Sequence, residues 1–297
     1  MKIINLNKYH SILIFFLSII FFLINLDLNY RLNTLICFFL IATLGVSHGA
    51  LDNLKGYKLL KKFKIKNNFY FYLSYIILAL VVVVLWYLLP AITLIVFLFV
   101  ASFHFGKEDN VFGFNKKIKF LNFFLFLKGS LVISSPMYFN FDETAEIFQI
   151  LDVNISNIND QMLLIIIVLS LLSNFLISKN ILFSFLDSLS IILLNYTFDP
   201  LIAFTVYFCF LHSIRHAFSI INEINKSNFN KGLTNFIKLA LPLTLITGVF
   251  FTFSVYFLNH FYLLNSAILK VVFIGLASLT FPHILLEYLL EKNEKKT

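Results

Sequence analysis

Long apolar stretches alternate with short polar connections along the whole chain. A helix that crosses a bilayer needs about 20 mostly apolar residues, and most of these stretches approach or exceed that length. The pattern therefore predicts an all-α, polytopic integral membrane protein with about ten transmembrane helices in one domain that covers residues 1–297. The expected spans are 9–26, 33–54, 69–88, 90–106, 118–139, 162–177, 181–196, 201–222, 232–258 and 262–290.

The two stretches on either side of Lys179 leave a second topology open. Each is near the lower limit of about 17 residues for a full crossing. They could form a re-entrant helical pair instead of two crossings, and eight full spans would then remain.

The composition excludes a soluble globular protein. Of the 297 residues, 60% are hydrophobic and 13% are charged, whereas an ordinary soluble domain has roughly a quarter charged residues. The net charge of +8 comes almost entirely from lysines in the connections, which is typical of cytoplasmic loops and does not indicate nucleic-acid binding. Cys37 and Cys209 lie within apolar stretches, where we expect small buried side chains and no disulfide.

The lysines also predict the orientation of the spans. They gather after the second, fourth, sixth, eighth and last spans, whereas the opposite connections are short or acidic. The positive-inside rule then places both termini in the cytoplasm, for a multi-pass protein of the inner (cytoplasmic) membrane. No small-residue cleavage site follows Lys2 and Lys8, so the first stretch is expected to be a span and not a removed signal peptide.

Five histidines lie inside predicted spans, where a polar side chain is costly and usually faces a functional interior. All lie on even-numbered spans, about one to three helical turns from the predicted cytoplasmic end, so they share one depth. Four helices that converge at one depth predict a metal site. The five are His48, His104, His212, His216 and His283, whereas His10 and His260 fall at span edges and are expected to be interfacial.

The type of metal site follows from the ligands available. His212 and His216 are four residues apart and project from one helix face, but Ser213 replaces the glutamate that a zinc protease of this spacing needs, which argues against hydrolysis. Imidazole suits zinc, copper, iron or nickel, and no thiolate pair favours a structural zinc. We expect catalytic Fe(II), because four neutral histidines leave two positions of an octahedral ion open for dioxygen and substrate.

Carboxylates, one arginine and several phenylalanines are expected around the metal. Asp52, Glu108 and Glu287 each follow a histidine by four residues and could orient its ring, although they could also simply mark cytoplasmic helix ends. Gly106 could break the helix before Glu108 and leave Asp109 as the inward carboxylate. Arg215 is expected to pair with Asp52, Asp109 or Glu287 in a structural role. The candidates for a substrate wall are Phe103, Phe105, Phe208, Phe210 and Phe281.

The motifs SHGALD, HFGKED, HSIRH and FPH, in this order, resemble those of the Brp/Blh family of membrane-bound β-carotene 15,15′-dioxygenases of bacteria and archaea. The resemblance covers most of the chain. It implies iron-dependent cleavage of the central double bond of β-carotene by dioxygen to two all-trans-retinal molecules, usually to supply a microbial rhodopsin. The implied iron ligands are His48, His104, His212 and His216. We expect His283 to lie beside the ligands or in the substrate wall, where Pro282 opens the helix.

Three other functions remain as alternatives. A bis-His haem protein that carries electrons across the membrane would use two of the histidines and leave the others unexplained. A cation or proton transporter predicts polar residues at several depths, whereas this sequence concentrates them near one leaflet. A di-iron desaturase or hydroxylase typically needs more histidines than the seven in the chain.

Overall fold

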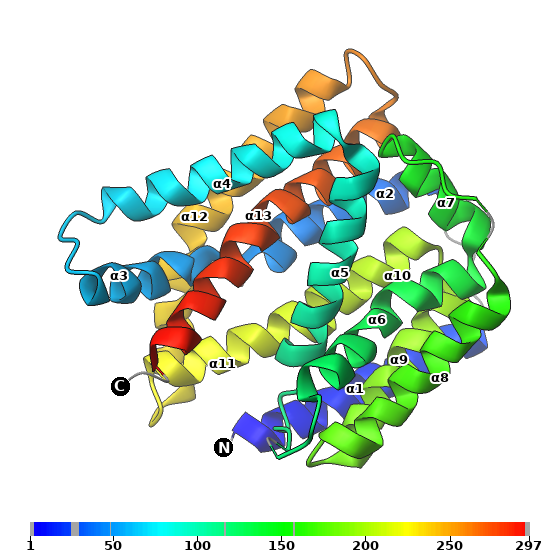
Figure 1. Cartoon of the computed structure of the whole chain (residues 1–297), viewed down its shortest axis with the longest axis horizontal. Helices are drawn as coiled ribbons and strands as arrows, with labels where there is room; N and C mark the ends of the chain where they lie inside the picture. The colour runs from blue at the N-terminus through cyan, green and yellow to red at the C-terminus, as the bar shows by residue number, and fades with distance from the viewer. Residues whose placement is uncertain (1–2, 25–29, 48, 116, 157, 295–297) are drawn as a thin grey trace.

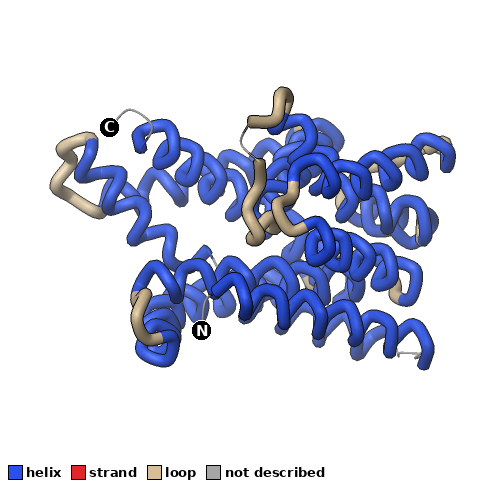
Figure 2. Tube along the Cα trace, turned by 90° about the horizontal axis from the view of Figure 1, so that it is seen from below, coloured by secondary structure: helices blue, strands red, loops and turns tan. Residues whose placement is uncertain are grey.

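The computed structural model describes residues 3–24, 30–47, 49–115, 117–156 and 158–294, and these residues form helices joined by short loops, with no β-strand (Figure 2). The all-α class predicted from the sequence is confirmed for this part of the chain. In chain order, the elements are α1 (Ile3–Ile24), α2 (Tyr30–Leu40), η1 (Ile41–Gly45), η2 (Gly49–Leu51), α3 (Asp52–Lys62), α4 (Phe69–Leu88), α5 (Pro90–Glu108), α6 (Leu121–Phe139), α7 (Phe141–Ile150), α8 (Asp160–Ile177), α9 (Ile181–Thr197), α10 (Pro200–Val206), η3 (Tyr207–Ser213), α11 (Ile214–Ile224), α12 (Phe229–Leu258) and α13 (Leu264–Glu294).

Eight helical stretches within the described residues are long and apolar enough to cross a membrane. Large apolar side chains cover their outer surfaces, as at Tyr87, Val249 and Phe253. A surface of this kind is typical of helices in contact with lipid, and the prediction of a polytopic membrane protein is confirmed. The eight stretches are Ile3–Ile24, Thr34–Lys62, Phe69–Leu88, Pro90–Glu108, Asp160–Ile177, Pro200–Ile224, Phe229–Leu258 and Leu264–Asn293.

The two remaining predicted spans, 118–139 and 181–196, correspond to α6 and α9, which are more polar or shorter than the other eight. α6 has 19 residues, but Lys128 and several serines interrupt its apolar sequence, and α9 has only 17 residues. α6 packs against α5, α8 and α9, and α9 packs against α1. If the two stretches around Lys179 formed a re-entrant pair, neither α8 nor α9 would cross the membrane. α8 is nevertheless one of the eight stretches that are long and apolar enough to cross.

Two of the predicted spans that carry histidines are not continuous α-helices. The π-helical turn η1 follows α2, and the π-helical turn η3 separates α10 from α11. The Ser213 hydroxyl of η3 donates a hydrogen bond of 3.2 Å to the Gly45 carbonyl of η1, so the two irregular turns lie against each other. π turns shift the register of a helix by one residue and are frequent at functional sites.

The acidic connection after α6 is a helix, although the sequence was expected to form a loop there. α7 begins directly after α6 and has Asp142 and Glu143 in its first turn, where the helix dipole favours a carboxylate. In Figure 1, α7 and the α12–α13 connection lie toward the upper right, whereas the α3–α4 connection lies at the left and the end of α11 and both marked chain ends lie toward the lower left. Basic connections therefore gather at one end of the bundle.

Helices α5 and α6 approach each other too closely for any side chain larger than hydrogen at two positions. A Cβ atom at Gly106 would lie 1.8 Å from the Leu125 carbonyl oxygen, and one at Gly129 would lie 1.8 Å from the Ser102 carbonyl oxygen. Gly106 therefore serves this contact. It does not break the helix as expected, because α5 continues to Glu108. The contact holds α5, and His104 with it, against α6.

Candidate metal centre

Four of the five histidines predicted to share one depth come together in the structure. They are buried and lie on α5 (His104), η3 (His212), α11 (His216) and α13 (His283). The ring centroid of His104 lies 5.4 Å from that of His212 and 5.3 Å from that of His283, and those of His216 and His283 are 5.8 Å apart. The fifth, His48, lies outside the described residues.

His212 is held by a carboxylate that a tyrosine supports in turn. Its Nδ1 atom lies 2.7 Å from an oxygen of Asp109, and the Tyr207 hydroxyl donates a hydrogen bond of 2.5 Å to the other oxygen. Burial alone would raise the pKa of Asp109, which follows the last residue of α5, but His212 and Tyr207 lower it below its ordinary value. A carboxylate in this position would accept a hydrogen bond from Nδ1 and leave Nε2 to face a metal ion, because histidines that bind a metal usually direct their other ring nitrogen to a carboxylate.

The π-helical turn η3 explains how Tyr207 and His212 reach the same carboxylate. The two residues are five positions apart, which is one more than the spacing that aligns side chains in an α-helix. In a π-helical turn the hydrogen-bonded partners are five residues apart, so positions i and i+5 share a face. The local expansion of the helix is therefore the feature that assembles this arrangement.

A second tyrosine–aspartate–histidine arrangement stands on the other side of the cluster. The Nδ1 atom of His283 lies 2.8 Å from an oxygen of Asp52, and the Tyr75 hydroxyl donates a hydrogen bond of 3.0 Å to the same oxygen. Asp52 and His283 are both buried. Three elements, α3, α4 and α13, thus fix the ring of His283 in the way that α5 and η3 fix the ring of His212. Pro282 lies inside α13, which continues to Glu294, so the expected opening of the helix does not occur.

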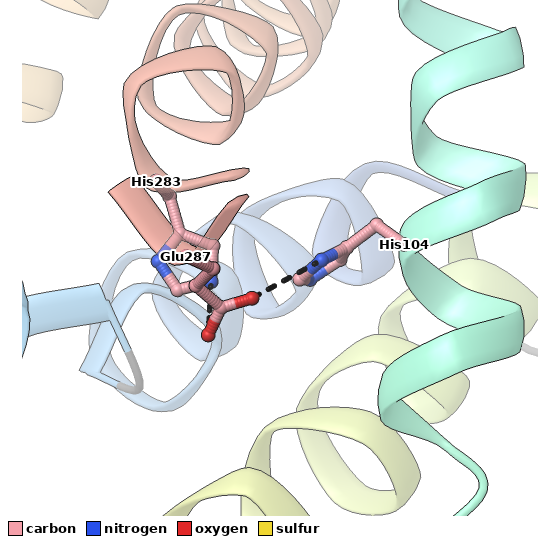
Figure 3. Close-up of side chains that lie close together, drawn as sticks. All are labelled: His104, His283 and Glu287. Carbon is pink, nitrogen blue, oxygen red and sulfur yellow. Dashed lines mark ion pairs between the residues drawn. The ribbon is translucent and has the colours of Figure 1, made fainter. Parts of the chain in front are cut away.

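Glu287 lies at the edge of the histidine cluster (Figure 3). Its carboxylate oxygens are 4.0 Å from Nδ1 of His104 and 3.7 Å from Nε2 of His283. The Lys55 ammonium lies 2.9 Å from one of these oxygens. Glu108 plays a similar part for His216, with an oxygen 3.5 Å from Nδ1. All four carboxylates expected near the histidines therefore face them, and they do more than mark helix ends.

The donor set fits a metal ion that prefers imidazole. Within the described residues, two groups of three side chains bring ligand atoms within 4.8 Å of one another, namely His104 and His283 with Glu287, and His216 and Glu108 with Glu287. Cys37 and Cys209 are buried free cysteines and belong to neither group. Imidazole nitrogens combined with carboxylate oxygens suit a first-row transition metal such as iron, so the residue types of both groups fit Fe(II). Of the ligands expected from the sequence, the groups contain His104 and His216, and His212 is in neither.

An apolar cavity of about 260 Å³ reaches the histidines. His104, His212 and His283 form part of its wall, and most of the remainder is apolar or aromatic. Ile76 also lines the cavity and is exposed on the outer surface of α4, so the cavity lies next to the outer surface of this helix. An apolar molecule in this cavity would therefore lie against the cluster of imidazoles.

Comparison with known proteins places this arrangement in a family. The family model described as "Beta-carotene 15,15'-dioxygenase" matches residues 39–291. The chain belongs to the β-carotene 15,15′-dioxygenase family. A curated relative, "Beta-carotene 15,15'-dioxygenase" of uncultured marine bacterium 66A03, is 30% identical over 258 residues, which are 83% of this chain and 90% of the relative. No solved structure matches. The resemblance based on the four motifs is confirmed.

The aromatic wall of this dioxygenase-family chain differs in part from the wall expected from the sequence. Phe105 and Phe208 line the cavity, and their rings contact His212 with centroid distances of 5.0 and 5.7 Å. Phe103, Phe210 and Phe281 are not among the residues that line it. Five aromatic residues that the motifs do not mark also line the cavity. Phe71, Tyr72 and Tyr75 lie on α4, and Phe97 and Phe204 lie one or two turns before His104 and Phe208 on the same helix faces.

Arg215 has a structural role, as expected, but its predicted partners are wrong. Its guanidinium makes two hydrogen bonds with Asp187 of α9, of 2.6 and 2.7 Å, and another of 2.7 Å with the Ser11 hydroxyl of α1. It also donates to His10 at 3.3 Å. Asp187 is the one charged residue in the predicted span 181–196, and no motif marks it as a partner. Arg215 therefore anchors α11 to α1 and α9.

Proposed function

We propose that this chain cleaves the central 15,15′ double bond of β-carotene with dioxygen, in an iron-dependent reaction that yields two all-trans-retinal molecules. Family membership supports the reaction class. The structural observation that carries the proposal is the cluster of four histidines from four helical elements, three of which line an apolar cavity. A membrane-dissolved hydrocarbon and a metal held by neutral imidazoles would meet at this place.

The proposed iron ligands are His48, His104, His212 and His216. Fe(II), when bound, would supply the activation of dioxygen. The residues around it hold the ligands in place, because a carboxylate on one imidazole nitrogen fixes the ring orientation and raises the basicity of the other nitrogen. The ring of His283 contacts Asp52 as the ring of His212 contacts Asp109. The effect of His283→Ala on iron affinity measures how much His283 contributes to metal binding.

The chain's part in the reaction is to position the polyene and to exclude water. Phe105 and Phe208 stand at the boundary between the cavity and His212, where apolar contacts would hold the central bond beside the metal. Positioning of this kind converts an encounter into an effectively unimolecular step. Cleavage breaks one C=C bond and places one atom of dioxygen on each new aldehyde, so the balance needs no further reductant, and no residue is assigned as an acid or a base.

The membrane setting of the proposal follows from the same cavity. A carotenoid dissolved in the bilayer would reach the cavity at Ile76 without passing through water. We propose that the chain is a multi-pass protein of the cytoplasmic membrane with both termini inside, as the one-sided lysines predict. The retinal would serve as the chromophore of a microbial rhodopsin.

Expression in cells that accumulate β-carotene tests the reaction. We expect loss of the yellow pigment and appearance of retinal, measured by chromatography of the extracted pigments. Unchanged β-carotene in cells with confirmed membrane expression would contradict the proposal. A haem absorption band in the purified protein would support the bis-His haem alternative instead.

A series of alanine variants tests the ligands. Replacement of His48, His104, His212 or His216 should reduce both bound iron and retinal below detection, because at most three of the proposed ligands would remain in a water-poor site. His283→Ala is expected to lose about 10 to 100-fold in iron affinity and to keep measurable activity with iron in excess. The opposite ranking, with His283→Ala iron-free and His104→Ala active, would show that His283 is a ligand in place of one of the four.

A further inference from the structure

A second cavity lies behind the metal centre. Its volume is about 90 Å³, and its wall comes from α5, α6, α7, α9, α10, η3 and α13. The short helix α7 closes it on one side through Ile147 and Phe148. The rest of its wall includes Leu94, Val132, Ile191 and Ala203. Neither the proposed ligands nor the site carboxylates line this cavity.

The few polar side chains around the second cavity already have hydrogen-bond partners within the protein. The Thr144 hydroxyl donates to the Asn140 carbonyl at 2.7 Å, and the Asn195 amide donates to the Ile191 carbonyl at 2.8 Å. The Tyr207 hydroxyl is committed to Asp109. A bound water needs two to four polar partners, and apolar cavities without them stay dry. This cavity is therefore suited to a small apolar molecule.

The size of the second cavity limits its occupant to a very small molecule. An apolar cavity of about 150 Å³ engineered in another protein binds benzene or xenon. A cavity of about 90 Å³ is smaller than that, so it has room for a diatomic gas or a single xenon atom. It has no room for one half of a carotenoid.

Only one layer of side chains separates the second cavity from the first. Phe97, Ala101, Phe105 and Phe204 line both cavities. The Phe105 ring contacts His212 with a centroid distance of 5.0 Å. Small rotations of these rings would let a diatomic molecule pass to the histidines, whereas a polyene with its bulky end group would not pass.

We propose that the second cavity holds dioxygen beside the metal centre and delivers it past Phe105 to the face of the cluster next to His212. The inference rests on the proposed function, in which dioxygen is a substrate. An apolar gas is better accommodated in a dry apolar cavity than in water, so the cavity raises the local supply of dioxygen without occupying the space that the polyene needs.

A matched pair of alanine-to-valine variants tests the inference. Ala203→Val places two methyl groups at the wall of the second cavity, whereas Ala267→Val makes the same change at an equally buried position of α13 that lines neither cavity. Ala203→Val should lower kcat/KM for dioxygen by about threefold to tenfold, with iron content and the KM for β-carotene unchanged. Ala267→Val, compared at equal iron content, should leave kcat/KM for dioxygen and the KM for β-carotene as in the wild type.

Xenon provides a readout that does not depend on turnover. Xenon NMR of the purified wild-type chain should show one saturable site that Ala203→Val removes, and xenon should inhibit the wild type in competition with dioxygen and not with β-carotene. Absence of xenon binding, or an Ala203→Val variant that changes only the KM for β-carotene, would overturn the inference. A wild-type chain that binds xenon but forms no retinal would instead contradict the proposed function alone.

Discussion

Asp109 offers the sharpest test of how the site holds its metal. Asp109→Asn keeps the size of the side chain but removes its charge, and with it the ionised acceptor for Nδ1 of His212 at 2.7 Å and for the Tyr207 hydroxyl at 2.5 Å. A neutral amide is a weaker acceptor than a carboxylate, and its amino group can turn toward His212 and favour the wrong tautomer. We expect weaker iron binding with the helices intact.

The expected magnitude follows from the number and kind of hydrogen bonds lost. Loss of a carboxylate that supports a metal-bound histidine typically weakens metal affinity by about 10 to 100-fold, which is about 1.4 to 2.7 kcal/mol. Tyr207→Phe leaves the carboxylate and its charge in place and removes one donor to it, a hydrogen bond worth about 1.5 to 3 kcal/mol because the acceptor is charged. Only the part of this loss that changes the orientation of Asp109 affects the metal. The two variants should therefore rank in this order, with Asp109→Asn the weaker binder.

The assay is iron retained by the purified protein during dialysis against a series of chelator-buffered Fe(II) concentrations. Asp142→Asn is the matched control, because Asp142 is an exposed carboxylate in the first turn of α7. An Asp109→Asn chain that is folded and binds iron as tightly as the control would refute the idea that Asp109 orients a ligand. An equal loss in the control would show that the effect is one of general charge.

Three further predictions concern the scaffold. Asp187→Ala leaves a buried arginine without its carboxylate and should lower the stability to unfolding in detergent by about 3 to 5 kcal/mol; an unchanged melting temperature would contradict this. Gly129→Ala puts a Cβ 1.8 Å from a carbonyl oxygen of α5, so folded protein should be lost, whereas Gly248→Ala, with its nearest atom at 3.9 Å, should express normally. Cysteines at Lys62 and Asp152 should be labelled from the cytoplasm and from outside, respectively; labelling of both from one side would overturn the topology.

The sequence allowed the fold class and much of the site to be predicted, because both depend on local patterns. Apolar length identifies helices that cross a bilayer, and polar residues within them are rare enough to stand out. The convergence of His104, His212, His216 and His283 followed from the alternation of spans alone. The histidines could be counted and placed by depth without knowledge of any side-chain contact.

The supporting residues of the site could not be predicted in the same way. Tyr75 and Tyr207 look like two more aromatic residues in apolar helices, and only the folded chain shows that each donates to a site carboxylate. The π-helical turn that brings Tyr207 into register has no sequence signature comparable to a helix cap. A weak signal did exist for Phe97, which lies seven residues before His104 and so on the same helix face.

The partner of Arg215 shows a second limit of reading the sequence. Asp52, Asp109 and Glu287 were plausible partners because they lie near the expected metal, yet two of them are committed to His212 or His283 and the third to Lys55. Arg215 pairs instead with Asp187 of α9. Pairing between buried charges depends on which helices are neighbours, and spacing along one chain does not contain that information.

The most direct test of the account is the dependence of retinal formation on iron in the purified protein. Chelated protein should form no retinal, and Fe(II) alone should restore cleavage, with two molecules of retinal formed for each β-carotene consumed. Retinal formation at the wild-type rate by metal-free protein, or products of unequal length from cleavage away from the central bond, would contradict the claim that the histidine cluster holds iron for central cleavage.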